Sequence, residues 1–267
     1  MPSPEASIAK KPNVALITGG ASGIGRVIAE AFIARGHCVH VCDIDSAAID
    51  SFLQANPDAK ATLADVADDA QVSRVFDELA DCHDQLDILV NNVGIAGPTA
   101  HVEDISPIEW DQTIAVNLNG HFYCTRRAVP MLKAAESGSI INISSNAAFF
   151  GCPLRAPYVA SKWALIGLTK TLAMELGPFG IRVNAICPSS VEGERIDAVI
   201  ERDAKRRGKS AQEVRDMYLR QSSMRTFVTP EDVANLAIFL TSDRSARISG
   251  QALGLDGHTE SLMNWLD

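Results

Sequence analysis

The sequence is poor in aromatic residues and has no excess of positive charge. Aromatic side chains are 6% of its 267 residues, and 24 Lys and Arg residues stand against 33 Asp and Glu, which gives a formal net charge of -9. Nucleic acids and anionic membrane surfaces attract basic patches, so this composition argues against either as a partner. A small molecule is the partner that we expect.

Long apolar runs and paired cysteines are also absent. No stretch approaches the ~18 apolar residues of a membrane-spanning helix, and residues 1–12 (MPSPEASIAKKP) lack the apolar core of a secretion signal. The cysteines form no CxxC pair, and several fall in apolar runs typical of buried strands. We expect reduced cysteines, a cytoplasmic location and a flexible segment over residues 1–12, and we identify no metal-ligating set.

What the chain does contain is an alternation of short apolar runs with longer segments of helical periodicity. The alternation predicts strands at 13–18, 38–42, 61–63, 86–92, 139–144, 182–186 and 252–256, and helices at 23–35, 46–55, 68–81, 107–135, 156–176 and 230–240. Strands that are apolar on both faces and separated by helices form a parallel sheet covered on both sides. The expected fold class is therefore α/β, a Rossmann-type doubly wound parallel sheet of about seven strands.

The length and the absence of linkers or repeats predict one domain over residues 13–267. One segment, residues 194–227, departs from the alternation because it is charged and helical in character without a strand of its own. We interpret it as a helical lid inserted over the carboxyl edge of the sheet.

A glycine-rich loop, residues 18–25 (TGGASGIG), joins the first strand to the first helix. Glycines allow a tight turn and close approach of a ligand, and the helix N-terminus that follows offers free N–H groups to a pyrophosphate. A plain turn is the alternative for any lone glycine cluster. Here the order strand, glycines, helix and second strand within about 30 residues favours a dinucleotide site.

Asp43 ends the second strand, where a carboxylate can accept hydrogen bonds from an adenosine ribose and repel a 2′-phosphate. No Lys or Arg stands at Ala21, Ser22 or Ile44. NAD is therefore favoured over NADP. Asp45 is a neighbouring alternative carboxylate, but a helix beginning at Ser46 gives it a role as N-cap.

Seven short motifs now follow one another in a recognisable order. They are TGGASGIG (18–25), LADV (63–66), NNVG (91–94), VNL (116–118), ISS (143–145), YVASK (158–162) and SGQALGLDG (249–257). With these motifs the chain resembles the classical short-chain dehydrogenase/reductase family over nearly its whole length. The resemblance implies an enzyme that acts on CH–OH groups with a nicotinamide cofactor, and a homotetramer in which helices 107–135 and 156–176 form a shared bundle.

By this resemblance the catalytic residues are Asn117, Ser145, Tyr158 and Lys162. Tyr158 is expected to be the acid/base, with the charge of Lys162 favouring its phenolate form, since a free tyrosine titrates near pH ~10. Ser145 is expected to hydrogen-bond the substrate oxygen, and Ser144 to point away from it along the strand. Asn117 is expected to position a water in a proton relay.

The resemblance also assigns residues to the cofactor. Lys162 is expected to hold the hydroxyl groups of the nicotinamide ribose, and Asp65 to lie near the adenine. The cofactor-binding set is Gly19, Ser22, Gly23, Ile24, Gly25, Asp43, Asp65, Val66, Asn92, Gly94, Tyr158, Lys162, Pro188 and Val191.

The chain departs from the family pattern after the sixth strand. Family members usually continue as P-G-x-V-x-T, whereas residues 188–193 read PSSVEG, with Ser189 for the glycine and Gly193 for the threonine. The threonine hydroxyl normally holds the nicotinamide carboxamide, so that contact is missing here. We hypothesise that the backbone at Val191 keeps the main contact.

The lid carries Arg195, Arg202, Lys205, Arg206, Arg207 and Lys209 among acids of its own. A solvated helix face explains such a run, and recognition of an anionic or polyhydroxylated substrate is the sharper alternative, with Arg155 as a further candidate. The expected function is NAD-dependent hydride transfer to or from a secondary alcohol of polyol, sugar-like, cyclic or hydroxy-acid type. The alternatives are an NADP-dependent ketone reductase and a non-catalytic dinucleotide-binding regulator.

Overall fold

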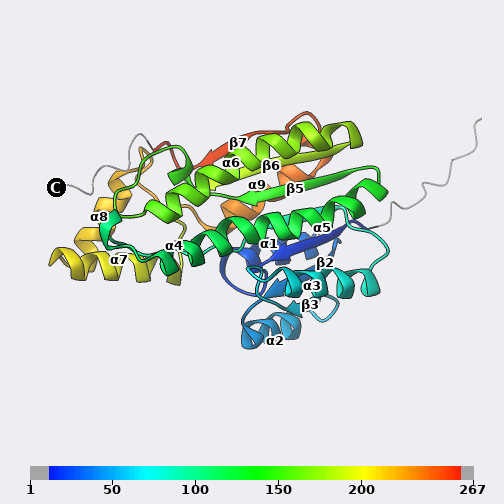
Figure 1. Cartoon of the computed structure of the whole chain (residues 1–267), viewed down its shortest axis with the longest axis horizontal. Helices are drawn as coiled ribbons and strands as arrows, with labels where there is room; N and C mark the ends of the chain where they lie inside the picture. Colours follow the sequence, from blue (N-terminus) through cyan, green and yellow to red (C-terminus); the bar gives the residue numbers. More distant parts are fainter. Residues whose placement is uncertain (1–11, 260–267) are drawn as a thin grey trace, which may run out of the picture.

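A parallel sheet of seven strands forms the centre of the molecule in the computed structural model, which describes residues 12–259 (Figure 1). The strand order is β3-β2-β1-β4-β5-β6-β7. The strands are β1 Val14–Thr18, β2 Cys38–Asp43, β3 Lys60–Leu63, β4 Ile88–Asn91, β5 Gly138–Ile143, β6 Ile181–Pro188 and β7 Ala252–Leu255. The predicted doubly wound α/β fold is confirmed. The expected flexible segment 1–12 lies, apart from Pro12, outside the described residues.

The five central strands, β2, β1, β4, β5 and β6, contribute side chains to two separate apolar cores. In β1, Ala15 and Ile17 pack on one face with α1 Gly23–Ile33, α2 Ser46–Ala55 and α9 Pro230–Thr241. Val14 and Leu16 pack on the other with α3 Asp69–Cys82, α5 Gly120–Ala134 and α6 Ala156–Leu176. Successive side chains of a strand point to opposite faces, so a strand with both faces covered is apolar throughout. This is why the strands were recognisable as continuous apolar runs.

The order of the strands also places the ligand-binding crevice. β1 and β4 are hydrogen-bonded neighbours, with Ala15 opposite Ile88, yet the chain leaves β1 toward α1 on one face and β4 toward α5 on the other. The two connections diverge and leave a crevice at the carboxyl ends of these strands, where ligands bind in doubly wound sheets.

The helix expected over residues 107–135 is interrupted. It consists of α4 Pro107–Ile114, a π-helical segment η2 Ala115–Asn119, and α5. A π-helix carries one extra residue per turn and re-aims its side chains, often at functional sites. Here the bulge carries Asn117, which is fully buried. Gly120, directly after it, lies so close to Val66 that an added Cβ would be 2.8 Å from Val66 Cγ2.

The segment expected to be a lid forms two helices, α7 Glu194–Arg207 and α8 Ala211–Arg220, at one end of the molecule (Figure 1). They have a small core of their own, built on Ile196, Ile200, Ala204, Val214 and Phe227. Two backbone bonds close the base of the lid, from Glu192 N–H to the Val228 oxygen at 2.8 Å and from Val228 N–H to the Ser190 oxygen at 3.0 Å.

Short helical turns complete the connections: η1 Val102–Asp104, η3 Asn146–Ala148, η4 Gly177–Phe179 and η5 Asp243–Ser245. Within residues 12–259, every helix is too short or too polar to cross a membrane.

Candidate active site

The glycine loop is held tightly against the carboxyl end of β4. Gly19 and Gly23 have φ values of +61° and +51°, a conformation that L side chains rarely adopt. The Asn92 Nδ2 atom donates to the carbonyl oxygens of Thr18 at 3.0 Å and Gly19 at 3.2 Å. A Cβ added to Gly25 would lie 1.9 Å from the Gly19 oxygen, so only glycine lets α1 begin this close to the loop.

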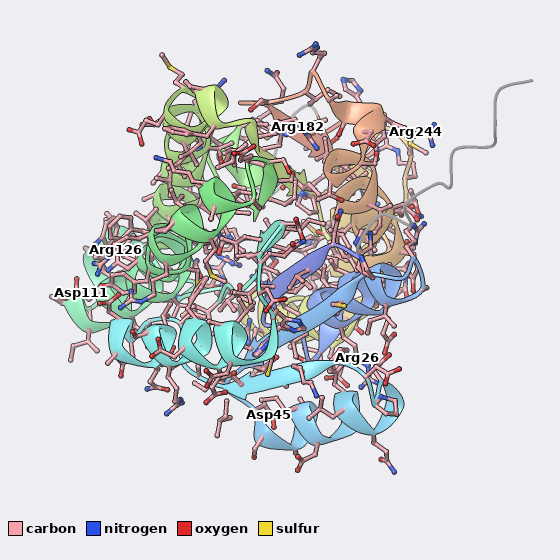
Figure 2. The ribbon with its side chains drawn as sticks, turned by 90° about the vertical axis from the view of Figure 1, so that its right-hand side faces the viewer. Arg26, Asp45, Asp111, Arg126, Arg182 and Arg244 are labelled. Atoms are coloured by element: carbon pink, nitrogen blue, oxygen red, sulfur yellow. The ribbon has the colours of Figure 1, made fainter. Side chains whose placement is uncertain are left out.

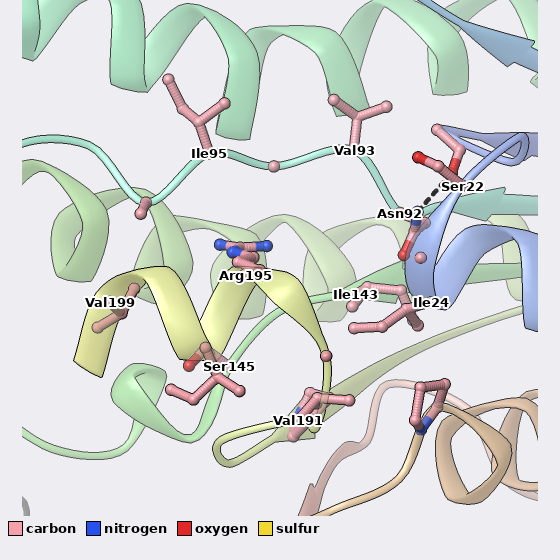
Figure 3. Close-up of a pocket in the computed structure, with 18 of the residues that line it drawn as sticks. Ser22, Ile24, Asn92, Val93, Ile95, Ile143, Ser145, Val191, Arg195 and Val199 are labelled. Atoms are coloured by element: carbon pink, nitrogen blue, oxygen red, sulfur yellow. Dashed lines mark hydrogen bonds between the residues drawn. The ribbon is translucent and has the colours of Figure 1, made fainter. Parts of the chain in front are cut away.

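One large cavity of about 1040 Å³ runs along the carboxyl edge of the sheet. Figure 3 shows Ser22 and Asn92 at one side of it, Val199 at the other and Arg195 between them. Most of the predicted site residues line this cavity: Gly19, Ser22, Gly23, Ile24, Asp43, Asp65, Val66, Asn92, Gly94, Ser145, Tyr158, Lys162, Pro188 and Val191.

Two predicted site residues lie behind the cavity wall. Gly25 is one, and its contact with Gly19 shapes the loop rather than contacting a ligand. Asn117 is the other: its Oδ1 atom accepts the Ile95 N–H at 2.7 Å, and its Nδ2 atom donates to the Ile95 oxygen at 3.0 Å and to Ser161 Oγ at 3.2 Å. Its side chain therefore fastens the loop after β4 to α6.

Asp43 marks one end of the cavity and is 8% exposed. Its carboxylate oxygens accept the N–H groups of Ala21 and Asp45, each at 3.2 Å. Asp45 is the N-cap of α2, as expected, because its side chain accepts from Ala47 and Ala48. The carboxylate of Asp43 is thus held in place beside the glycine loop with lone pairs left for a ligand.

Arg26 also lines this end, and Figure 2 shows it beside α2. Its guanidinium pairs with Glu30 at 2.8 Å and donates to Ser51 Oγ at 3.2 Å. Sequence reasoning examined residues 21, 22 and 44 for a positive charge and missed Arg26, whose position directly after Gly25 was the available signal.

Ser145, Tyr158 and Lys162 converge in the middle of the cavity. Ser145 lies two residues beyond the end of β5, and Tyr158 and Lys162 lie one turn apart near the start of α6. The Lys162 Nζ atom is 5.8 Å from the centroid of the Tyr158 ring and donates to the Ile143 oxygen at 3.0 Å. Ser144 turns the other way, with its Oγ donating to the Lys162 backbone oxygen at 3.0 Å.

The surroundings of Tyr158 favour its ionised form. Burial alone raises the pKa of this phenol, but the positive charges of Arg195 and Lys162, a hydrogen bond from Ser145 and the charge of Arg155 outweigh it, so the pKa lies below 10.0. Burial and, more weakly, the charge of Arg195 outweigh the opposing effect of Tyr158 and lower the pKa of Lys162 from 10.5 to about 8. A phenol with a lowered pKa beside a buried amine is better suited to proton transfer than a free phenol.

A buried histidine near Lys162, His121, was missed by the reasoning from sequence. His121 is 1% exposed and its Nε2 atom donates to the Val93 oxygen at 3.0 Å. Burial, with a smaller effect of Lys162, lowers the pKa of His121 to about 3, so it is neutral and supports the loop after β4. Its spacing of four residues from Asn117 on one helix was the signal that could have found it.

In the segment that departs from the family pattern, the backbone groups of Val191 are available to a ligand. The Val191–Val228 bridge uses backbone groups of Ser190 and Glu192, so the N–H and C=O groups of Val191 make no hydrogen bond within the described residues. Val191 lines the cavity. Gly193 has φ +128°, which a threonine adopts only with strain. Glycine at 193 is therefore required by the turn into α7.

These features fit a dinucleotide. The helix α1 has no side-chain N-cap bond, an added Cβ at Gly23 meets nothing within 4 Å, and one at Gly94 would lie 3.2 Å from Lys162 Nζ. The loop and the first turn of α1 can thus take a pyrophosphate, and the lack of a side chain at Gly94 leaves room beside Lys162.

Comparison with known proteins shows similarity along nearly the whole chain. Residues 19–258 match a protein-family profile described as enoyl-(acyl carrier protein) reductase. The chain is 34% identical to a 3-oxoacyl-[acyl-carrier-protein] reductase of Thermotoga maritima over 248 residues, 91% of this chain and 96% of that protein. It is 33% identical to a D-beta-hydroxybutyrate dehydrogenase of Rhizobium meliloti over 253 residues, again 91% and 96%.

Solved structures show the same similarity in space. An NAD+-bound xylitol dehydrogenase superposes with a TM-score of 0.87 at 27% identity, covering 93% of this chain and all of that one. A levodione reductase superposes with a TM-score of 0.86 at 27% identity, covering 92% of this chain and 96% of that one.

Proposed function

The chain belongs to the short-chain dehydrogenase/reductase family and is an NAD(P)-dependent oxidoreductase of hydroxyl or ketone groups, and from this premise we propose NAD as its cofactor and Tyr158 as its acid/base. The observation that carries the proposal is that Ser145, Tyr158 and Lys162 line the same cavity as Asp43 and the glycine loop, and the lowered pKa of Tyr158 supports it. A phenol activated in this way serves proton transfer to or from a substrate oxygen.

In the direction of alcohol oxidation, the substrate hydroxyl binds at Ser145 and Tyr158. The Tyr158 phenolate takes the proton of the hydroxyl oxygen while a hydride leaves the carbon that carries this oxygen. A ketone forms, and the proton stays on the tyrosine. The bound nicotinamide supplies the hydride acceptor. Lys162 keeps the phenolate favoured through its charge, and Ser145 stabilises the charge that develops on the oxygen. Ketone reduction runs through the same groups in reverse.

The preference for NAD rests on Asp43. Its fixed carboxylate suits the two hydroxyl groups of an adenosine ribose and repels a phosphate in that place. The similar xylitol dehydrogenase is described as NAD+-bound, which agrees with this preference. One observation favours NADP instead, because Arg26 also lines this end, but its pairing with Glu30 would have to be given up to bind a phosphate.

For the assembly we propose a homo-oligomer that covers the outer surface of α4, α5 and α6. Large apolar side chains are exposed there, including Ile108 at 79%, Phe122 at 45% and Trp163 at 51%. Exposed apolar side chains gathered on neighbouring helices are typical of a subunit interface. Gel filtration with light scattering would test this proposal, and a monomer at micromolar concentration would contradict it.

The function is tested by following the absorbance of reduced nicotinamide with NAD and with NADP across secondary alcohols, polyols, cyclic alcohols and hydroxy acids. We expect turnover that is faster with NAD. Tyr158→Phe should abolish turnover and retain NAD binding, while the matched control Tyr123→Phe, which lies outside the cavity lining, should remain active. A preference for NADP would contradict the role of Asp43. NAD binding without turnover of any compound would favour a dinucleotide-binding regulator.

A further inference from the structure

Arg155 is a buried guanidinium without a counterion beside the reacting groups. It lies three residues before Tyr158, is 8% exposed, and its Cζ atom is 4.9 Å from the centroid of the Tyr158 ring. Its Nη2 atom donates to the Ala96 oxygen at 2.9 Å, but its Nε atom is buried with no hydrogen-bond partner among the described residues. A buried charge without an opposite charge beside it is costly, so the guanidinium of Arg155, with its Nε still unbonded, indicates an anion that the described residues do not supply.

Arg195 brings a second unpaired guanidinium to the same cavity. It projects from the first turn of α7 into the middle of the opening (Figure 3). Its charge acts on both Tyr158 and Lys162. Among residues 12–259, no ion pair involves Arg155 or Arg195.

Other arginines of the lid do have acidic partners. Arg206 and Arg207 pair with Asp203 at 3.6 Å and 2.9 Å, and Arg215 pairs with Asp197 at 2.8 Å. A solvated or structural role therefore explains these three. Arg195 is exposed as well, but it differs from these three because it lines the cavity and has no acidic partner among the described residues.

Acidic residues do line the same cavity and would oppose an anion. Glu192 and Glu194 are exposed near the base of the lid and pair with neither arginine, while Asp43 and Asp65 lie toward the end with the glycine loop. The positive charge is concentrated around Tyr158, where Arg155, Lys162 and Arg195 all contribute to its electrostatic environment.

We propose that the substrate is a hydroxy acid, or the corresponding keto acid, whose carboxylate is bound by Arg155 and Arg195. The inference rests on the proposed function, because it concerns the molecule whose hydroxyl group Tyr158 deprotonates. The position of Arg155 over the Tyr158 ring implies a short carbon chain between the carboxylate and the reacting carbon. Guanidinium groups bind carboxylates through paired charge-assisted hydrogen bonds, which suits this role.

A second, smaller cavity shows where the rest of such a substrate could extend. It has a volume of about 330 Å³, and Arg155, Val199 and Tyr218 line both cavities. The carboxylate of Asp203 also lines the smaller cavity, where it pairs with Arg206 and Arg207. Arg155 thus stands at the junction, and the carboxylate would bind at the boundary between the reacting centre and the space beneath the lid.

The test compares hydroxy acids with the neutral amide of each, with one, two or three carbons separating the carboxyl carbon from the carbinol carbon. We expect the wild-type protein to turn over a hydroxy acid with a higher kcat/KM than its amide. Arg155→Met and Arg195→Met should each lower that ratio by about tenfold or more, mainly through KM. Arg244→Met, which lies outside the cavity lining, is the matched control and should leave the ratio unchanged.

The ratio separates recognition from catalysis. If the arginines serve only to lower the pKa of Tyr158, both substrates slow equally, the ratio stays constant and the inference is wrong. If the variants weaken NAD binding without changing the ratio, the arginines serve the cofactor, which also overturns it. Turnover of neutral alcohols in preference to every hydroxy acid would contradict the inference and leave the proposed function intact.

A binding measurement covers the case in which none of these alcohols is turned over. Calorimetric titration of the NAD-loaded protein with malonate, and with malonamide as its neutral counterpart, should show binding of malonate that weakens in Arg155→Met. Absence of malonate binding would contradict the carboxylate site. Malonate binding together with no turnover would support the site and count against the proposed function alone.

Discussion

Gly25 offers a sharp test of how the glycine loop is built. In Gly25→Ala the new Cβ would lie 1.9 Å from the Gly19 carbonyl oxygen and 2.6 Å from Asn92 Nδ2, whereas real Cβ atoms essentially never approach within 3.0 Å. The first neighbour is backbone and cannot rotate away, so α1 and the loop must separate by more than about 1 Å. We expect both stability and NAD binding to suffer.

The magnitude follows from two opposing effects. Alanine at a helical position gains up to about 1 kcal/mol over glycine, while overpacking of this severity costs about 3 kcal/mol. The free energy of unfolding should therefore fall by about 2 kcal/mol. A displacement of the loop by about 1 Å should also raise the dissociation constant of NAD by tenfold or more, because its N–H groups no longer meet the pyrophosphate.

Gly167→Ala is the matched control. Gly167 lies inside α6, and an added Cβ there meets nothing within 4 Å. It should be neutral or stabilising by up to about 1 kcal/mol, with unchanged NAD binding. Urea denaturation and titration of NAD by protein fluorescence measure both variants, and gel filtration checks that Gly167→Ala keeps the oligomer. If Gly25→Ala unfolds and binds NAD like the control, the reasoning from close approach is refuted.

Three further predictions concern charge and backbone conformation. Burial lowers the pKa of Lys162 from 10.5 to about 8, so between these pH values the unfolded chain binds more protons than the folded chain. The free energy of unfolding of the wild type should therefore rise relative to that of Lys162→Met as the pH rises from about 8 to 10.5. Urea denaturation at several pH values would show this gain, and a constant difference would contradict it. Asp43→Asn should reduce the preference for NAD over NADP by about tenfold, because a charge-assisted ribose contact and the repulsion of phosphate are both lost; an unchanged ratio of kcat/KM values would exclude Asp43 as the determinant. Gly193→Thr should destabilise the protein by about 1–3 kcal/mol because of its φ of +128°, and tighter NAD binding in this variant would instead show that the missing hydroxyl limits affinity.

Much of the fold could be predicted because its signals are local. The strands buried on both faces, such as β1 and β4, appear as unbroken apolar runs, and their alternation with helices is compatible with few arrangements other than a parallel sheet. The π-helical break at Ala115–Asn119 was not predicted, because residues 107–135 keep a helical pattern across it. The bulge depends on contacts with Ile95 and Ser161 that lie far away in the sequence.

The candidate site divides in the same way. The spacing of Tyr158 and Lys162 on one helix, and the position of the glycines after a strand, follow from local geometry and were available from the sequence alone. The pairing state of each arginine was not. The lid of basic residues resembled a uniform solvated face, and only the folded chain separates Arg206 and Arg207, paired with Asp203, from the unpaired Arg195.

The sequence by itself thus determined the fold class and the family, because periodicity and short motifs act within one turn of helix or one strand. The tertiary structure decided which charges meet. Arg155 is the N-cap of α6, Lys162 lies within α6, and Arg195 belongs to the lid. Their combined effect on Tyr158 exists only once β5, α6 and α7 are packed around one cavity. Coulomb interactions depend on distance through space, and no pattern along the chain encodes that distance.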